Sequence, residues 1–344
     1  MRTVIILLMT AARFLAEGDS KAEVEAAAGL ALAHEGKYTL AISHYRAALA
    51  LDPNIPGLYL NLGLAYIKTN KFTEAASAFE KATQADPGSF QARVLLGMSY
   101  FGCRRFDAAA IQLQKAADHD PENIELRYKL AQSYLWSKQY QNAIEQFRLL
   151  LIRDPDSAPI HMLLGEVLDA ANKEEQATAE FEAAVKVSPH QPEAHFGLGY
   201  MYWKQRRFDD ASREFRAELE DQPQHTQALT YLGDAEMHLG KDQEARAHLQ
   251  QALKLDARTR LAHLDLGIVL AAQKDNARAE SHLREAIRLD PLKPDAHYRL
   301  GKLLSSVGRG REAEAEFVKV KELASMEQVE PLISVPGRKG QPVP

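Results

Sequence analysis

The sequence predicts an all-α protein built as a solenoid of antiparallel helix pairs. Three observations lead to this prediction. Proline recurs every 34 residues, alanine and glycine form two further columns at the same spacing, and apolar residues between them recur every three or four positions. Each unit of such an array can bury its apolar faces only against its neighbours, so the units must stack.

The three columns run through the chain in register, without an insertion. The proline column consists of Pro53, Pro87, Pro121, Pro155, Pro189, Pro223 and Pro291, with Ala257 in the remaining slot. The alanine column is unbroken and consists of Ala41, Ala75, Ala109, Ala143, Ala177, Ala211, Ala245, Ala279 and Ala313. The third column consists of Gly29, Gly63, Gly97, Ala131, Gly165, Gly199, Gly233, Gly267 and Gly301. Because proline lacks an amide hydrogen and clashes with a continuing helix, its column marks the end of each unit.

The second repeat shows how each unit folds. Residues 59–66 and 75–82 carry apolar side chains at helical spacing, which places one apolar stripe on each of two helices. The link at 69–71 is short, so the two helices must lie antiparallel. Small side chains in the glycine and alanine columns, such as Gly63, permit close helix approach, and Phe79 fills the space between the helices.

These columns resemble the tetratricopeptide repeat family, whose 34-residue pattern contains W-x2-L-G-x2-Y, A-x3-F and a closing P. The resemblance covers residues 22–323, which form nine repeats. It implies a right-handed superhelix whose concave groove binds a peptide or partner helix, and a noncatalytic role as an interaction scaffold or adaptor. One departure is that the family's Trp column is here more polar: Glu25, Tyr59, Arg93, Arg127, His161, His195, Leu229, His263 and His297.

The resemblance assigns the inward columns of the first helices to the groove. The candidate partner-binding residues in these columns are Leu60, Asn61, Leu64, Met98, Phe101, Tyr128, Gln132, Met162, Glu166, Phe196, Tyr200, Trp203 and Asp234. A contiguous apolar patch usually marks an interaction surface, which makes the aromatic residues anchors for a partner. The alternative is that curvature packs the same side chains between repeats as core. Acidic Glu166, Asp169 and Asp234 either select a partner with basic residues beside apolar ones or form a solvated surface.

Two recognition devices of related repeat proteins are not encoded here. The clamp that binds chaperone C-terminal carboxylates needs Lys, Asn, Asn, Lys and Arg at set columns of three adjacent repeats, and no register supplies them. The asparagine ladder of the glycosyltransferase superhelices needs Asn in one column of most repeats, and only Asn61 fits.

Composition excludes several classes of function. Among 344 residues, 42 Lys and Arg against 47 Asp and Glu give a net charge of -5, which disfavours a nucleic-acid partner. The single cysteine, Cys103, excludes disulfides and cysteine-based metal sites. No apolar run approaches the roughly 20 residues of a membrane span. We expect no catalytic residues, no cofactor and no metal site, because no catalytic motif is present and four histidines in the Trp column are explained by packing.

The N-terminal residues leave the cellular compartment of the protein open. Residues 1–21 begin with Arg2 and the apolar run 4–9, which fits either a signal peptide or a capping helix for the first repeat. We therefore expect a cytoplasmic protein if residues 1–12 are not a signal peptide, and a periplasmic or secreted protein if they are. A cleaved or anchoring N-terminus would favour an alternative role as an assembly factor for a bacterial-type envelope or secretion complex.

The C-terminal end of the array raises a question of self-association. Residues 324–344 are rich in Pro and Gly and are expected to form a flexible tail. Because little chain follows the last repeat, we expect Leu300, Leu303 and Leu304 to remain partly exposed unless the tail or a second protomer covers them. A homo-oligomer through this edge, and a self-associating structural solenoid, therefore remain alternatives.

Overall fold

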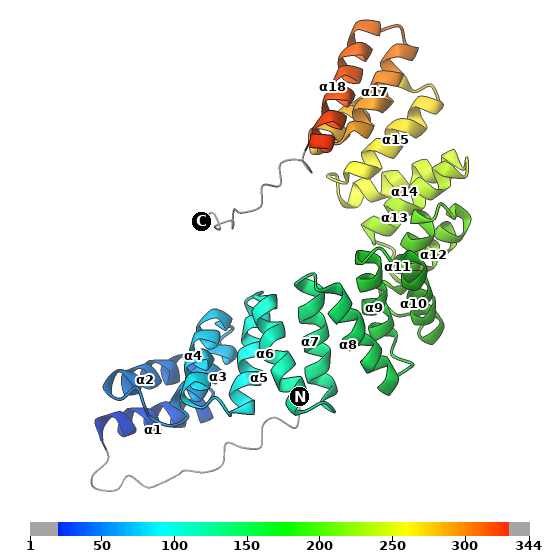
Figure 1. Ribbon diagram of the computed structural model, residues 1–344. Coiled ribbons are helices and arrows are strands. Elements are labelled where there is room, and N and C mark those ends of the chain that lie inside the picture. Colours follow the sequence, from blue (N-terminus) through cyan, green and yellow to red (C-terminus); the bar gives the residue numbers. More distant parts are fainter. Residues whose placement is uncertain (1–19, 330–344) are drawn as a thin grey trace. The chain divides into compact units, whose positions relative to one another are not determined.

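The computed structural model describes residues 20–329, with side chains to residue 325, and these residues form eighteen helices and no strand. They fall into two units, each a row of antiparallel helix pairs (Figure 1). The helices of the first unit are α1 (Lys21–His34), α2 (Tyr38–Leu51), α3 (Leu58–Lys68), α4 (Phe72–Ala85), α5 (Phe90–Gly102), α6 (Phe106–His119), α7 (Ile124–Trp136) and α8 (Tyr140–Arg153). Those of the second unit are α9 (Ala158–Ala170), α10 (Glu174–Val187), α11 (Ala194–Lys204), α12 (Phe208–Asp221), α13 (Thr226–His238), α14 (Asp242–Leu255), α15 (Arg260–Ala272), α16 (Asn276–Leu289), α17 (Pro294–Ser306) and α18 (Gly310–Val329).

The same turn connects the two helices of every repeat. One residue in each turn adopts the left-handed conformation, and these residues are again 34 apart: Gly36, Asn70, Arg104, Lys138, Asn172, Arg206, Gly240, Lys274 and Gly308. The second helices from α2 to α16 end at a residue with non-helical backbone directly before the proline column, as at Asp52, because a residue preceding proline disfavours the helical conformation. The predicted punctuation of the repeats is therefore confirmed.

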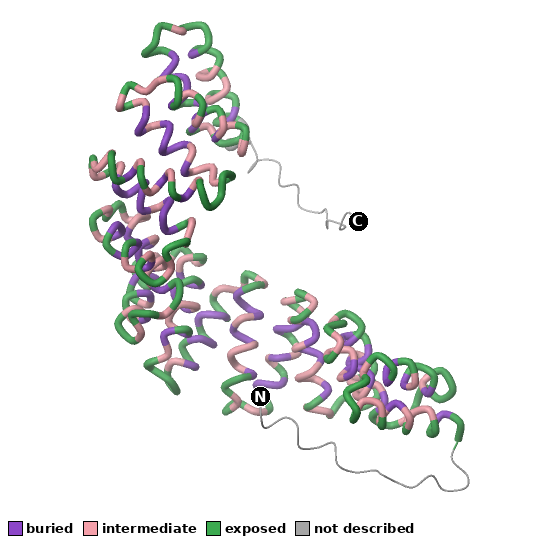
Figure 2. Tube along the Cα trace, turned by 180° about the vertical axis from the view of Figure 1, so that it is seen from behind, coloured by how far each residue is buried: buried purple, intermediate pink, exposed green. Residues whose placement is uncertain are grey.

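The small-residue columns form the seam between paired helices. Every member of the alanine column is buried. A methyl group built on Gly63 would lie 2.6 Å from the Phe79 ring, so only glycine fits the observed separation of α3 and α4. Buried residues lie along the inner faces of the paired helices (Figure 2). The predicted close approach at this column is confirmed.

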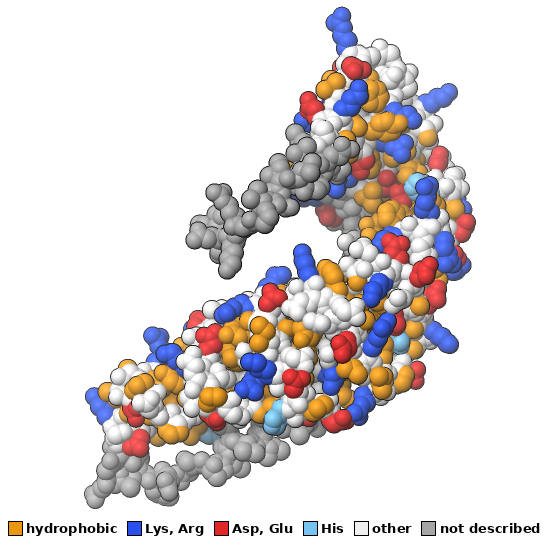
Figure 3. All heavy atoms as spheres, viewed as in Figure 1, with side chains coloured by type: hydrophobic (Ala, Val, Ile, Leu, Met, Phe, Trp, Pro, Cys, Tyr) orange, Lys and Arg blue, Asp and Glu red, His pale blue; other side chains and the backbone are white. Residues whose placement is uncertain are grey.

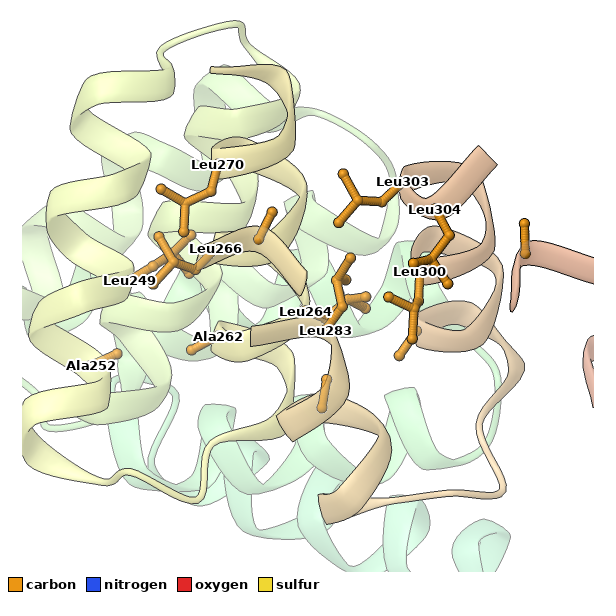
Figure 4. Close-up of a cluster of buried hydrophobic side chains, with 14 of the residues drawn as sticks. Leu249, Ala252, Ala262, Leu264, Leu266, Leu270, Leu283, Leu300, Leu303 and Leu304 are labelled. Carbon is orange, nitrogen blue, oxygen red and sulfur yellow. The ribbon is translucent and has the colours of Figure 1, made fainter. Parts of the chain in front are cut away.

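The C-terminal edge differs from the expectation. Leu300, Leu303 and Leu304 are buried, and they belong to the apolar cluster that extends from α13 to α18 (Figure 4). The reason is that α18 is itself the second helix of the last repeat, and it packs Ala313 and Phe317 against this cluster. The expectation that these three leucines need the tail or another protomer to cover them was wrong.

Two further sequence expectations concern the chain ends and the membrane. The signal-peptide and tail assignments at residues 1–19 and 330–344 lie outside the described residues. No helix among residues 20–329 is long and apolar enough to cross a membrane.

The charged side chains are mixed on the surface. On the face drawn in Figure 3, basic and acidic side chains are interspersed, without a large area of one sign.

Candidate functional site

The predicted groove residues fall into two sets, one in each unit. In the first unit, α3, α5 and α7 hold Leu60, Asn61, Leu64, Met98, Phe101, Tyr128 and Gln132, all of them half-buried. In the second unit, α9, α11 and α13 hold Met162, Phe196, Tyr200 and Trp203, which are half-buried, Glu166, which is exposed, and Asp234, which is buried. Contacts within each set decide which residues form a site.

In the first unit, a lysine of the chain itself covers the aromatic side chains. Lys129 on α7 places its ammonium 4.8 Å from the centre of the Phe101 ring and 5.9 Å from that of Tyr128. The same ammonium donates a hydrogen bond of 3.0 Å to the amide oxygen of Gln132. Three predicted residues are thus joined through Lys129, a residue that the prediction of the groove omitted.

Trp136, the last residue of α7, is exposed and was not among the predicted site residues either. Trp136 is 55% exposed and its ring centre lies 6.2 Å from that of Phe106. These two rings and Arg104 and Arg105 line a hollow of about 430 Å³. The position lies at the last residue of a first helix, where periodicity alone does not distinguish an inward from an outward side chain.

In the second unit, four aromatic side chains of α11 and α13 form one cluster, which we call the aromatic face: Phe196, Tyr200, Trp203 and Tyr231. The first three stack along α11, with ring centres 6.4 Å and 5.8 Å apart. Tyr231 meets Tyr200 and Trp203 edge to face, at 5.3 Å and 5.0 Å. All four are half-buried, so they serve as packing between repeats and as accessible surface at once. Tyr231 was not among the predicted site residues.

A buried carboxylate lies beside the aromatic face. The indole N–H of Trp203 donates a hydrogen bond to Asp234 on α13, and Nε2 of His238 lies 3.8 Å from the same carboxylate. Burial raises the pKa of Asp234, while the bond from Trp203 and the charge of His238 oppose the rise. Burial, together with Tyr200 and the two nearby aspartates Asp234 and Asp265, raises the pKa of Tyr231 to about 12.

Asp265 on α15 is the second of these aspartates. It is 2% exposed, and its Oδ2 has no hydrogen-bond partner among the described residues. Burial raises its pKa well above the usual value, Asp234 and Asp295 raise it further, and Arg299 and Arg260 lower it. Arg260 is paired with Asp295. The second unit therefore holds two buried acids whose charged forms are disfavoured by burial.

Three potential metal ligands, Glu193, Glu218 and His225, have donor atoms within 4.8 Å of one another, but their hydrogen bonds give them a structural role. Glu218 accepts hydrogen bonds from the backbone N–H groups of Glu193 and Phe196 at the start of α11, at 3.2 Å and 3.1 Å. Nδ1 of His225 accepts the N–H of Ala228 at 3.1 Å, so the ring proton resides on Nε2 and is donated to Glu193 at 2.9 Å. Neither ring nitrogen is left with a lone pair for a cation.

The histidine column lies at the seam between the two helices of a repeat. His161, His195 and His297 pair with glutamates nineteen residues later, at 2.6 to 2.8 Å between Nδ1 and the carboxylate. In the eighth repeat the partner is instead His282, whose Nδ1 lies 2.9 Å from that of His263. The column therefore joins paired helices, as the packing interpretation predicts.

Comparisons with known proteins identify the family. Models described as tetratricopeptide repeat match residues 60–124, 162–211, 202–259, 104–167 and 270–328, and one described as TPR repeat matches residues 29–70. These matches cover most of the chain, which therefore belongs to the tetratricopeptide repeat family. Proteins of this family are generally noncatalytic scaffolds for protein interactions. No curated protein sequence matches the chain.

Solved structures similar to the chain are also repeat proteins. The C-terminal part of a TPR repeat-containing protein from Cytophaga hutchinsonii is 15% identical with a TM-score of 0.56, over 69% of this chain and 98% of that one. A tetratricopeptide repeat protein from Parabacteroides merdae is 17% identical with a TM-score of 0.54, over 71% and 96%. The Cut9–Hcn1 hetero-tetramer of the APC/C is 15% identical with a TM-score of 0.53, over 83% and 56%. At these identities the likeness shows the fold alone.

Proposed function

We propose that this protein is a noncatalytic scaffold that binds a peptide or partner helix on the first helices of its second unit. The observation that carries the proposal is the aromatic face. Four large rings lie together and half-exposed on adjacent first helices, where burial of all of them would be expected if they served only as core. Tyrosine and tryptophan are the residues that most often dominate binding energy at protein interfaces.

The contacts of the aromatic face also support a preorganised surface. Tyr200 and Trp203 are stacked with an interplanar angle of 15°, and the hydrogen bond to Asp234 fixes the indole ring. Rings that are already held in place lose little conformational entropy when a partner covers them. A partner helix or an extended peptide therefore has a rigid apolar platform to bind.

The test is the double change Tyr200→Ala with Trp203→Ala. Protein partners are captured from the native source with the wild-type chain, identified by mass spectrometry and then titrated as purified components by calorimetry. We expect affinity to fall by about 30-fold or more, since one interface hot spot contributes about 2 kcal/mol or more. Ile152→Ala, which removes an exposed apolar side chain from the second helix α8, should leave affinity unchanged. A partner bound equally by wild type and double variant would refute the site.

Two alternative roles follow from other parts of the chain. An assembly factor for an envelope or secretion complex would require a processed or anchoring N-terminus, which intact mass determination of the native protein reports directly. A self-associating solenoid would require a concentration-dependent mass in light scattering. The burial of Leu300, Leu303 and Leu304 removes the apolar surface from which self-association through the C-terminal edge was first inferred.

A further inference from the structure

The aromatic face differs from its counterpart in the first unit in aromatic content and in charge. Tyr200, Trp203, Tyr231 and Asp234 stand three repeats, or 102 residues, after Met98, Phe101, Lys129 and Gln132 in the same columns. In the first unit the lysine of this set lies over the Phe101 ring. In the second unit tyrosine replaces that lysine and aspartate replaces the glutamine. The second unit thus has more aromatic surface and a carboxylate, but lacks the cation.

Several other aromatic rings of the described residues also have a lysine or arginine over them. Lys81 lies 5.3 Å from the ring centre of Tyr59, and Lys302 lies 5.7 Å from that of Tyr298. Arg207 lies 4.1 Å from that of Tyr202. Within residues 20–325, no lysine or arginine takes such a position over Tyr200, Trp203 or Tyr231.

The electrostatic surroundings of the aromatic face favour a cation. The negative ring faces of Trp203 and Tyr231 attract positive charge, and Trp is the best of the aromatic residues in this respect. Donation of the indole N–H to Asp234 leaves more electron density on the ring, which strengthens that attraction. Asp234 lies in a weakly solvated environment, so its field at the rings is screened less than that of a surface carboxylate.

The nearby histidine leaves the charge of Asp234 incompletely balanced. His238 is 3.8 Å from this carboxylate and is stacked on Phe208, with ring centres 4.4 Å apart. By contrast, Asp169 on α9 is paired with a lysine, because Lys204 donates to it at 2.6 Å; the same ammonium lies 3.0 Å from Glu174.

We propose that the aromatic face binds the cationic side chain of a partner peptide, a lysine or arginine flanked by apolar residues. The cation lies over the rings of Trp203 and Tyr231, with Asp234 beside them as the counter-charge, and the apolar neighbours contact Phe196 and Tyr200. This inference rests on the proposed function and specifies the chemistry of the partner at that same site.

The test uses the two tryptophans of the chain. In a Trp136→Phe background, Trp203 is the single tryptophan, and its indole N–H gives one resolved nitrogen-15 NMR signal. The probes are the blocked tripeptides Leu-Lys-Leu and Leu-norleucine-Leu, titrated to about 20 mM because one cation–π contact gives only weak binding. We expect a saturable shift of the Trp203 signal with the lysine probe and at least about fivefold weaker binding of the norleucine probe. This comparison changes the probe and leaves the protein the same.

Two variants then locate the counter-charge. Asp234→Asn keeps an oxygen for the indole N–H and should weaken the lysine probe at least about fivefold, without changing the norleucine probe. The matched control Asp169→Asn removes a carboxylate that is paired with Lys204 and should have no effect.

Each failure has a separate signature. Equal binding of the two probes, absence of any shift with the lysine probe, or an unchanged affinity in Asp234→Asn would overturn the cation site. If the double change at Tyr200 and Trp203 nevertheless abolishes binding of a protein partner, the proposed scaffold function stands without the cation site. If the lysine probe binds as expected while partners bind the double variant unchanged, the cation site stands and the proposed scaffold function at the aromatic face fails.

Discussion

Gly197→Ala tests whether the spacing of α10 and α11 is limited by one ring. A methyl group at Gly197 would lie 2.4 Å from Cε1 of Phe181, about 1 Å less than the usual separation of carbon atoms in contact. The ring cannot move away freely, because its opposite edge lies against Gly165, where a methyl group would be 2.9 Å from Cε2. Overpacking of this kind costs about 1 to 3 kcal/mol, and alanine returns about 1 kcal/mol through its higher helix propensity. The difference is a net loss of up to about 2 kcal/mol in the free energy of unfolding. Because the contact at 2.4 Å is very short and the ring is held on both sides, we expect the upper half of that range, about 1 to 2 kcal/mol.

The assay is equilibrium unfolding in urea, followed by the fluorescence of Trp203 in the Trp136→Phe background. Trp203 lies on the same helix as Gly197, so it reports the local transition even if the repeats do not unfold as one unit. Adding Phe181→Leu should recover part of the loss, with a coupling of about 1 kcal/mol between the two changes. An unchanged or higher urea midpoint for Gly197→Ala would refute the argument from close approach.

Two further predictions concern the turns and the buried acids. Lys138 has φ of 61°, and three other repeats have glycine at this position, so Lys138→Gly should stabilise the chain by about 0.5 to 1 kcal/mol; a lower urea midpoint would contradict this. The pKa of Asp265 is higher in the folded chain than in the unfolded chain, so the folded state binds the proton more tightly. The free energy of unfolding of the wild type should therefore fall as pH rises from about 4 through the folded-state pKa of Asp265. The variant Asp265→Asn should melt at a higher temperature than wild type at pH 7 but not at pH 4, because asparagine stays neutral at both. An equal melting difference at both pH values would contradict the assignment.

The sequence predicts the fold well because the period determines most contacts within a repeat. The distance from Gly63 to Phe79 along the chain is the same as that from Gly165 to Phe181, and in both repeats the ring lies against the glycine. Residue types in fixed columns are therefore enough to identify the seam. The interpretation of the C-terminal edge failed for a different reason. Leu300, Leu303 and Leu304 on α17 were expected to need a cover from beyond the ninth repeat, although α18, the second helix of that repeat, already covers them.

The candidate site was predicted only in part, because it depends on contacts between repeats. Phe196, Tyr200 and Trp203 were identified from their columns, but Tyr231 and Asp265 were not. Both stand in the column of Asn61, which was considered only for the asparagine ladder of the glycosyltransferase superhelices. Their burial is set by side chains of the neighbouring repeats. Column identity alone does not say whether a polar residue in that position faces solvent or is enclosed.

A simple offset would have recovered these contacts from the sequence. Tyr200 meets Tyr231, and Trp203 donates to Asp234, so each contact joins residues 31 apart, three fewer than the period. Each first helix therefore contacts the first helix of the next repeat three residues before the position in the same column. Three residues are almost one turn of an α-helix, which has 3.6 residues per turn. Applied to the first unit, the same offset pairs Phe101 with Gln132, where the Lys129 ammonium lies near the ring and donates to the amide. The offset of 31 residues thus describes this position in both units, through a direct hydrogen bond in the second and through Lys129 in the first. The residue types give the first unit an internal cation and leave the second with a carboxylate and no lysine or arginine over its rings.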